Sequence, residues 1–131
     1  MSADDVELIR RAVQAWAEFD EEKALELASE DIEFFALRSA TEGTYHGHEG
    51  VRAFFADNRE SFDLFQPEYD EVTDLGDGRV LGIGSIRIRG RGSGVETDVP
   101  SAVLATVRDG RIVHFRDYGD RQAALQAAGL A

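Results

Sequence analysis

The segment that decides the fold is 79–118, RVLGIGSIRIRGRGSGVETDVPSAVLATVRDGRIVHFRDY. It is rich in apolar and β-branched residues, and two groups of turn residues divide it: the glycine-rich 90–94 and the pair Asp109-Gly110. Such runs are typical of strands, and an Asp-Gly pair between them indicates a tight hairpin. The segment therefore predicts strands over 79–89, 96–107 and 111–118, joined in order by hairpins.

The rest of the chain adds helices and further strands around this segment. Another turn at 76–79 joins it to an extended stretch, 67–75, and earlier strands are predicted at 32–37 and 44–46, with a loop around Ser39–Gly43 between them. Helical spacing of apolar residues predicts helices over 4–18, 21–28, 48–62 and 121–128. Asp20 and Asp120 are the expected N-caps of two of these helices, and Gly129 is the expected C-terminal stop.

Composition narrows the class of protein. The 131 residues fit a single domain, 1–131, and the absence of cysteine excludes disulfides, thiolate zinc sites and a cysteine nucleophile. The net charge of −12 argues against binding to nucleic acid or to anionic membranes. An acidic N-terminus without a signal-peptide pattern, and the lack of a membrane-length apolar run, predict a cytoplasmic protein.

The element order, helices first and hairpin-joined strands last, predicts an α+β fold. We expect a strongly curved antiparallel or mixed sheet, wrapped around the N-terminal helices to form a cone with an internal pocket. Such pockets are natural sites for small molecules.

Four stretches resemble the SnoaL-like proteins of the nuclear-transport-factor-2-like superfamily: the first helix with Trp16 and Phe19, then 45–52 (YHGHEGVR), 107–113 (VRDGRIV) and 115–120 (FRDYGD). The resemblance spans nearly the whole chain and implies the cone fold. It leaves the activity open, since the superfamily includes ketosteroid isomerase-like and polyketide cyclase-like enzymes as well as pure binding modules. It argues against a limonene-type epoxide hydrolase, because Phe35 and Leu37 stand where that group has a water-holding tyrosine and asparagine.

Asp117 is the candidate catalytic residue. The last-strand carboxylate of limonene-type epoxide hydrolases, which helps to activate a water, lies in a stretch similar to Arg116-Asp117-Tyr118, so Asp117 is the position that the resemblance carries over. Strand alternation places Asp117 on one face with Val113 and Phe115. Burial among apolar residues would raise the pKa of Asp117 and make it a usable general acid or base. The alternative is a carboxylate at a strand end that pairs with a nearby arginine.

The candidate substrate-binding residues are mostly aromatic: Trp16, Phe19, Phe35, Tyr45, Phe54, Arg87 and Phe115. Most aromatic residues of so small a domain must fill its core, so only some of them are expected to touch a ligand. Arg87, Arg89 and Arg91 share one strand face. They could capture an anionic group at the rim, but pairing with Glu96 and Asp98 across the hairpin is the favoured interpretation.

The histidines give a weaker signal. His46 and His48 are separated by Gly47 at a strand-to-helix junction, so no metal site is predicted from them, even together with His114. His114 falls on the face opposite Asp117, toward solvent or a dimer interface. The glycine-rich stretch 90–94 lacks the context of a phosphate-binding loop.

The sequence thus predicts a small-molecule-binding domain with no cofactor. One hypothesis is an acid/base isomerase or cyclase for a small hydrophobic or polyketide-like substrate, in which Asp117 moves a proton and a tyrosine or arginine stabilises the oxyanion. The alternative is a non-catalytic ligand-binding or assembly module. The resemblance also implies a homodimer through the outer face of the sheet.

Overall fold

The computed structural model describes residues 2–36 and 44–130. Over these residues the chain forms four helices: α1 (Ser2–Ala17), α2 (Glu21–Leu27), α4 (Gly47–Ser61) and α5 (Arg121–Ala128). It forms six strands: β1 (Ala28–Phe35), β2 (Tyr45–His46), β3 (Phe62–Asp74), β4 (Arg79–Gly90), β5 (Glu96–Arg108) and β6 (Arg111–Asp117). The predicted α+β class is confirmed, although β1 and β3 begin earlier than expected. The loop predicted around Ser39–Gly43, and Leu37, lie outside the described residues.

The local signals at the helix ends are confirmed. The side chain of Asp20 accepts a hydrogen bond from the backbone N–H of Lys23 at 3.1 Å, and Asp120 accepts one from Ala123 at 3.1 Å. Gly129 ends α5 in the left-handed conformation, with φ 80°, which glycine adopts at little steric cost.

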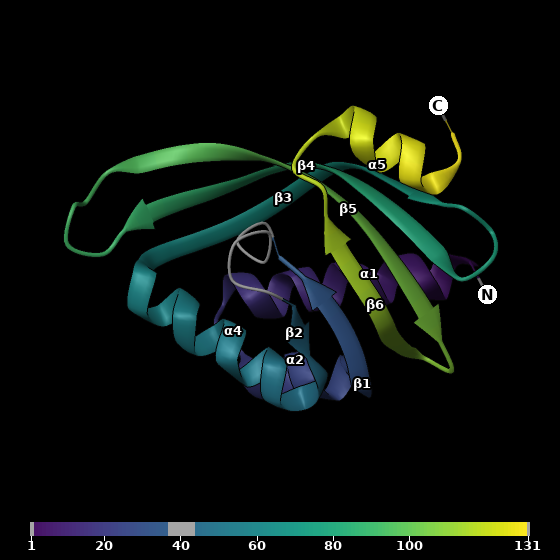
Figure 1. The fold of residues 1–131 in the computed structure, drawn as a ribbon, viewed down its shortest axis with the longest axis horizontal. Helices are drawn as coiled ribbons and strands as arrows, with labels where there is room; N and C mark the ends of the chain where they lie inside the picture. The colour runs from purple at the N-terminus through teal and green to yellow at the C-terminus, as the bar shows by residue number, and fades with distance from the viewer. Residues whose placement is uncertain (1, 37–43, 131) are drawn as a thin grey trace.

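The strands form one mixed sheet in the order β2-β1-β6-β5-β4-β3. The β1–β6 pair is parallel, and the other neighbours are antiparallel. Figure 1 shows α1, α2 and α4 on one side of the curved sheet and α5 on the other. We call the side toward α1 and α4 the inner face, and the side toward α5 the outer face.

A hydrophobic cluster covers each face of the sheet, and the cluster on the inner face is the larger one. The main core lies on the inner face and includes Phe54 and Phe55 of α4, Trp16 of α1, and Phe115 of β6. A smaller cluster on the outer face joins Leu81, Ala102 and Leu104 to Ala124 and Ala128 of α5. The far ends of β4 and β5 extend beyond both clusters as a projecting hairpin (Figure 1).

A bend in the edge strand β3 gives the sheet part of its curvature. Pro67 is accommodated here because an edge strand can lack a ladder N–H. The pairing with β4 shifts between Tyr69 and Glu71, which marks a bulge. Opposite this bulge, a Cβ on Gly84 would overlap the carbonyl oxygen of Glu68 and lie 2.7 Å from the Cα of Tyr69. Glycine at 84 therefore permits the close approach of the two strands.

The last strand corrects one prediction about faces. Val107 pairs with Ile112, but Thr106 pairs with His114, so Val113 is an extra residue in β6. Ile112 consequently packs in the main core with Phe115, whereas strict alternation had placed it on the opposite face. Phe115 and Asp117 share the inner face as predicted; Val113, the extra residue, does not belong to the core cluster.

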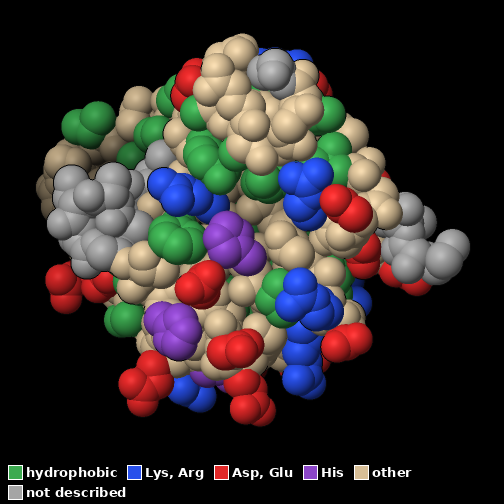
Figure 2. Space-filling model, turned by 45° about the vertical axis from the view of Figure 1, so that its right-hand side comes forward, with side chains coloured by type: hydrophobic (Ala, Val, Ile, Leu, Met, Phe, Trp, Pro, Cys, Tyr) green, Lys and Arg blue, Asp and Glu red, His purple; other side chains and the backbone are tan. Residues whose placement is uncertain are grey.

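No helix among the described residues is long and apolar enough to span a membrane. Figure 2 shows acidic and basic side chains interspersed over one face of the molecule, with the visible histidines set apart from one another.

Candidate functional site

The inner face holds a cavity of about 200 Å³ between the sheet, α1 and α4. The described residues that line it are Trp16, Phe34, Ala36, Phe54, Phe62, Phe65, Pro67, Tyr69, Ile86, Ile88, Val99, Phe115 and Asp117. All but Asp117 are apolar or aromatic. The cavity exceeds the 150 Å³ that holds benzene but is smaller than a typical drug pocket. It is suited to a ligand of one or two rings.

Aromatic rings form a closely packed wall at one end of the cavity. Trp16 meets Phe115 edge to face, with ring centroids 4.7 Å apart, and Phe34 meets Phe54 in the same manner at 4.6 Å. Edge-to-face pairs are favourable beyond the area that they bury, and they fix ring orientation. The wall is therefore preorganised for a flat apolar ligand.

Asp117 stands in this cavity and is held by three hydrogen bonds. Its Oδ1 accepts from the backbone N–H of Ala102 at 3.1 Å and of Gly119 at 2.9 Å. Its Oδ2 accepts from the hydroxyl of Ser101 at 2.6 Å. No arginine pairs with it among the described residues, so the alternative of an arginine-bound carboxylate at a strand end is not what the structure shows.

A tyrosine extends this hydrogen-bonded group. The hydroxyl oxygens of Tyr69 and Ser101 lie 2.8 Å apart, and Ser101 is only 2% exposed. An ionised carboxylate can only accept, so Ser101 donates its single proton to Asp117 and must accept the proton of Tyr69. The hydrogen bonds therefore run in one direction, from Tyr69 through Ser101 to Asp117.

Burial raises the pKa values of the residues at both ends of the hydrogen-bonded series Tyr69–Ser101–Asp117. Desolvation raises the pKa of Asp117, and the hydrogen bonds from Ser101, Gly119 and Ala102 partly oppose that rise. Burial, and secondarily the charge of Asp117, raises the pKa of the Tyr69 phenol well above its usual range. Tyr69 thus keeps its proton, whereas the carboxylate of Asp117 binds a proton more readily than it would in water.

The predicted substrate-binding residues divide into two groups. Trp16, Phe54 and Phe115 line the cavity. Phe19 packs against the core at the junction of α1 and α2, and Tyr45 donates a hydrogen bond to Asp57 at 2.6 Å. Neither is among the lining residues.

Phe35 and Arg87 lie away from the cavity. Phe35 packs against His114 at 5.3 Å between ring centroids, with the guanidinium of Arg116 over its ring. Arg87 pairs with Glu96 and Asp98, each at 3.2 Å, because residues of β4 alternate between faces and Ile86 takes the inner one.

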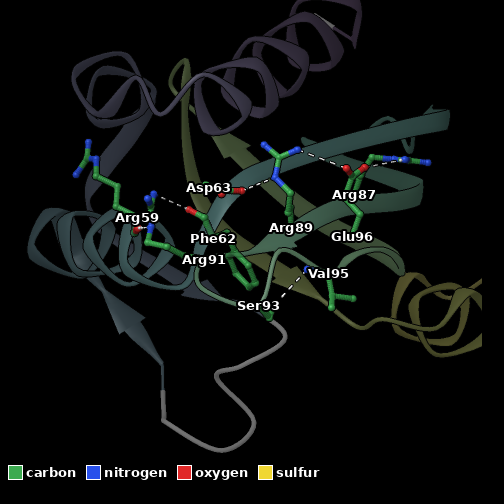
Figure 3. Close-up of polar contacts among 9 residues, drawn as sticks. All are labelled: Arg59, Phe62, Asp63, Arg87, Arg89, Arg91, Ser93, Val95 and Glu96. Atoms are coloured by element: carbon green, nitrogen blue, oxygen red, sulfur yellow. Dashed lines mark hydrogen bonds and ion pairs between the residues drawn. The ribbon is translucent and has the colours of Figure 1, made fainter.

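The neighbouring arginines behave in the same way. Figure 3 shows Arg89 between Asp63 and Glu96, while Arg91 donates to the carbonyl oxygens of Arg59 and Phe62. The contacts of Arg87 and Arg89 agree with the favoured interpretation, an exposed face on which arginines pair with acidic residues, whereas Arg91 binds backbone carbonyl groups at the end of α4.

The histidines form no common site. His48 donates from Nε2 to the carbonyl oxygen of Ala28 at 2.9 Å, and His114 contacts Phe35. Over the described part of the chain, no group of three His, Cys, Asp or Glu side chains could hold a metal ion.

Ser101 is a polar site residue that the sequence analysis missed, and the hydrogen bond between Tyr69 and Ser101 was not predicted either. The Asp109-Gly110 turn pairs Arg108 with Arg111. Counting residue by residue from that pair places Asp117 opposite Ala102, the neighbour of Ser101. The extra residue in β6 shifts the observed partner of Asp117 to Val103. Hairpin counting could therefore have found the serine, whereas the contact with Tyr69 depends on the bulge in β3.

Comparisons with known proteins agree with this architecture. A family model described as a SnoaL-like domain matches residues 9–115. The uncharacterized Mycobacterium tuberculosis protein Rv0034 is 27% identical over 125 residues, covering 94% of each chain.

Solved structures give the same fold. An NTF2-like protein from Burkholderia pseudomallei has a TM-score of 0.79 at 22% identity, covering 96% of this chain and 97% of its own. TerC, co-crystallised with polyporic acid, has a TM-score of 0.78 at 22% identity and covers 96% and 98%. Rv0760c from M. tuberculosis, in complex with estradiol-17β-hemisuccinate, has a TM-score of 0.75 at 16% identity and covers 88% and 92%.

Proposed function

Because this chain belongs to the SnoaL-like domain family, we propose that it binds a small apolar molecule in the inner cavity and moves a proton on it through Asp117. The observation that carries the proposal is a carboxylate standing in an otherwise apolar, aromatic wall. Ligands in the TerC and Rv0760c structures show that proteins of this fold accept ring compounds such as polyporic acid and an estradiol ester.

The chemistry follows from the surroundings of Asp117. A poorly solvated carboxylate is a stronger base than one in water, and burial raises the pKa of Asp117 in the direction that favours proton abstraction. Asp117 takes a proton from a C–H group beside a ligand carbonyl, and the C–H electron pair moves to the carbonyl oxygen to give an enolate. In a ligand whose C=C bond is conjugated with this enolate, return of the proton to the far carbon of that bond shifts the double bond and completes an isomerisation. Attack of the enolate carbon on a second carbonyl, with proton return to the new alkoxide, completes a cyclisation.

One observation favours the non-catalytic alternative. The expected mechanism gave the oxyanion to a tyrosine or an arginine, but Tyr69 donates its proton to Ser101 and Arg87 pairs with Glu96 and Asp98. The indole N–H of Trp16 is the remaining side-chain N–H among the described lining residues. A domain that only binds its ligand would not need a further hydrogen-bond donor to stabilise an oxyanion.

Hydrogen–deuterium exchange separates the two functions without knowledge of the natural substrate. We expect the protein to accelerate exchange of the α-protons of 2-tetralone, a bicyclic ketone, in deuterated buffer near neutral pH, followed by proton NMR. General-base catalysis typically contributes about 10²–10⁴-fold, so Asp117→Asn should lose most of the acceleration. Asp63→Asn is the matched control, because Asp63 is an exposed carboxylate that pairs with Arg89.

Binding is measured in parallel through the fluorescence of Trp16, the single tryptophan, which lines the cavity. Binding without acceleration by the wild type would support the binding module. Acceleration that Asp117→Asn retains would remove Asp117 from the mechanism. Absence of binding by any apolar ring compound would refute both functions.

The homodimer expected from the family resemblance is part of the proposal. Light scattering coupled to size exclusion tests it, and a mass of 14.4 kDa at high micromolar concentration would contradict it.

A further inference from the structure

Resting on the proposed binding function, we propose that the cavity selects flat apolar ligands that carry a hydrogen-bond donor, such as a phenol or an enol, and rejects their carboxylate counterparts. The inference comes from counting the donors and acceptors that the described wall offers to a ligand.

Asp117 offers an acceptor only. A carboxylate has about four lone-pair positions. Three are filled: two on Oδ1 by the N–H groups of Ala102 and Gly119, and one on Oδ2 by Ser101. The position that remains is on Oδ2, in a residue that lines the cavity. A ligand hydroxyl can fill it.

Tyr69 also offers an acceptor rather than a donor. Its proton is directed to Ser101, because Ser101 has given its own proton to Asp117. The phenol oxygen of Tyr69 keeps its lone pairs, and Tyr69 lines the same cavity. The hydrogen-bonded group of Asp117 and Tyr69 thus offers two acceptors, one of them charged, while the indole N–H of Trp16 is the single side-chain N–H among the described lining residues.

The negative charge of Asp117 also favours a neutral ligand over an anionic one. A ligand carboxylate placed beside Asp117 would meet a like charge in an apolar surrounding, where repulsion is poorly screened. The arginines that could offset it are engaged elsewhere: Arg87 with Glu96 and Asp98, and Arg89 with Asp63 and Glu96 (Figure 3). A neutral donor therefore fits the site better than an anion of the same shape.

Four probes of one shape test this inference: 4-propylphenol, propylbenzene, 4-propylanisole and 4-propylbenzoate. Each is titrated into the full chain at pH 7, and binding is followed by the backbone amide NMR signals of Ala102 and Gly119 together with those of the whole protein. A hydrogen bond to a charged acceptor corresponds to roughly 10- to 100-fold in affinity. We expect 4-propylphenol to exceed 4-propylanisole and propylbenzene by that factor, with 4-propylbenzoate weakest.

The outcomes separate the inference from the function on which it rests. Equal affinity of the phenol, the ether and the hydrocarbon would keep the binding function and overturn the donor selectivity. Tighter binding of the benzoate would also overturn it. Failure of all four probes to bind would overturn the proposed function itself, and the inference with it.

Asp117→Asn provides a second test. Its amide oxygen can still accept from Ala102 and Gly119, while its NH₂ group turns donors toward Ser101 and the cavity. The preference for the phenol over the ether should fall toward unity, and the benzoate should gain affinity. Asp63→Asn should keep the wild-type order. An unchanged order in a folded Asp117→Asn variant would show that Asp117 does not set the selectivity, and the wild-type series decides if the variant does not fold.

Discussion

Asp117 should make the protein less stable when it is ionised, and this can be measured as a pH-dependent difference between the wild type and Asp117→Asn. Burial raises the pKa of Asp117 in the folded state. The folded protein therefore binds this proton more tightly than the unfolded chain does. The stabilisation that follows is fully present below the unfolded pKa and is lost as pH rises through the folded pKa.

The structure sets the size of the effect. At neutral pH the asparagine amide preserves the hydrogen bonds from Ala102 and Gly119, so the free energy of unfolding should change by about 1 kcal/mol or less. As pH falls into the acidic range, the wild type should gain relative to the variant by at most about 1.4 kcal/mol per pH unit, the limit for one proton. Asp117→Leu removes the acceptor altogether. The N–H groups of the buried Ala102 and the half-buried Gly119 then lose this acceptor, and an unpartnered buried N–H costs about 1–3 kcal/mol.

Urea denaturation at a series of pH values, followed by Trp16 fluorescence and circular dichroism, measures this difference. The other acidic residues, among 26 in the chain, titrate in both proteins and cancel in the subtraction. A wild type that loses stability relative to Asp117→Asn as pH falls would refute the reasoning, because it would mean that hydrogen bonding outweighs burial and lowers the pKa. A difference that does not vary with pH would mean that the pKa of Asp117 is the same in the folded and unfolded protein, and would also refute the reasoning.

Three further substitutions test the fold around the site by the free energy of unfolding in urea. Gly84→Ala should lower the free energy of unfolding by about 1–3 kcal/mol or more, because the added Cβ overlaps the β3 backbone. The control Ser85→Ala, at the next residue, should have little effect. Equal effects of the two variants would contradict the close approach of β3 to Gly84. Asp120→Ala should lose about 1 kcal/mol with the N-cap of α5, and a loss restored by Asp120→Ser would confirm the capping role. Arg87→Ala should leave the free energy of unfolding nearly unchanged because its ion pairs are exposed, and a clear loss of stability would indicate a structural role for these pairs.

Most of the fold could be predicted because its signals are local. The Asp109-Gly110 pair, the caps at Asp20 and Asp120 and the stop at Gly129 each fix the backbone within a few residues, and the structure confirms all four. The parallel pairing of β1 with β6 could not be predicted in this way, because it joins distant segments without a hairpin. Only the tertiary structure determines such a pairing.

The candidate site was less predictable because strand irregularities decide it. Alternation placed Phe115 and Asp117 on one face correctly, but it failed at Ile112, since the extra residue Val113 changes the count. Phe35 and Arg87 were candidate substrate-binding residues by residue type, although ion pairing with Glu96 and Asp98 was already the favoured interpretation for Arg87. Their side chains lie outside the cavity, so residue type was a poor guide without the strand face.

The bulge in β3 and the extra residue in β6 together determine which side chains reach the site. Gly84 pairs with Tyr69, and only glycine lets β3 approach closely enough at the bulge to bring Tyr69 within 2.8 Å of Ser101. The extra residue in β6 keeps Phe115 and Asp117 on the inner face while Ile112 still fills the core. Bulges re-aim side chains without changing the order of the strands. A sequence that lacks either irregularity should therefore keep the order of the strands but place different side chains at the polar end of the cavity.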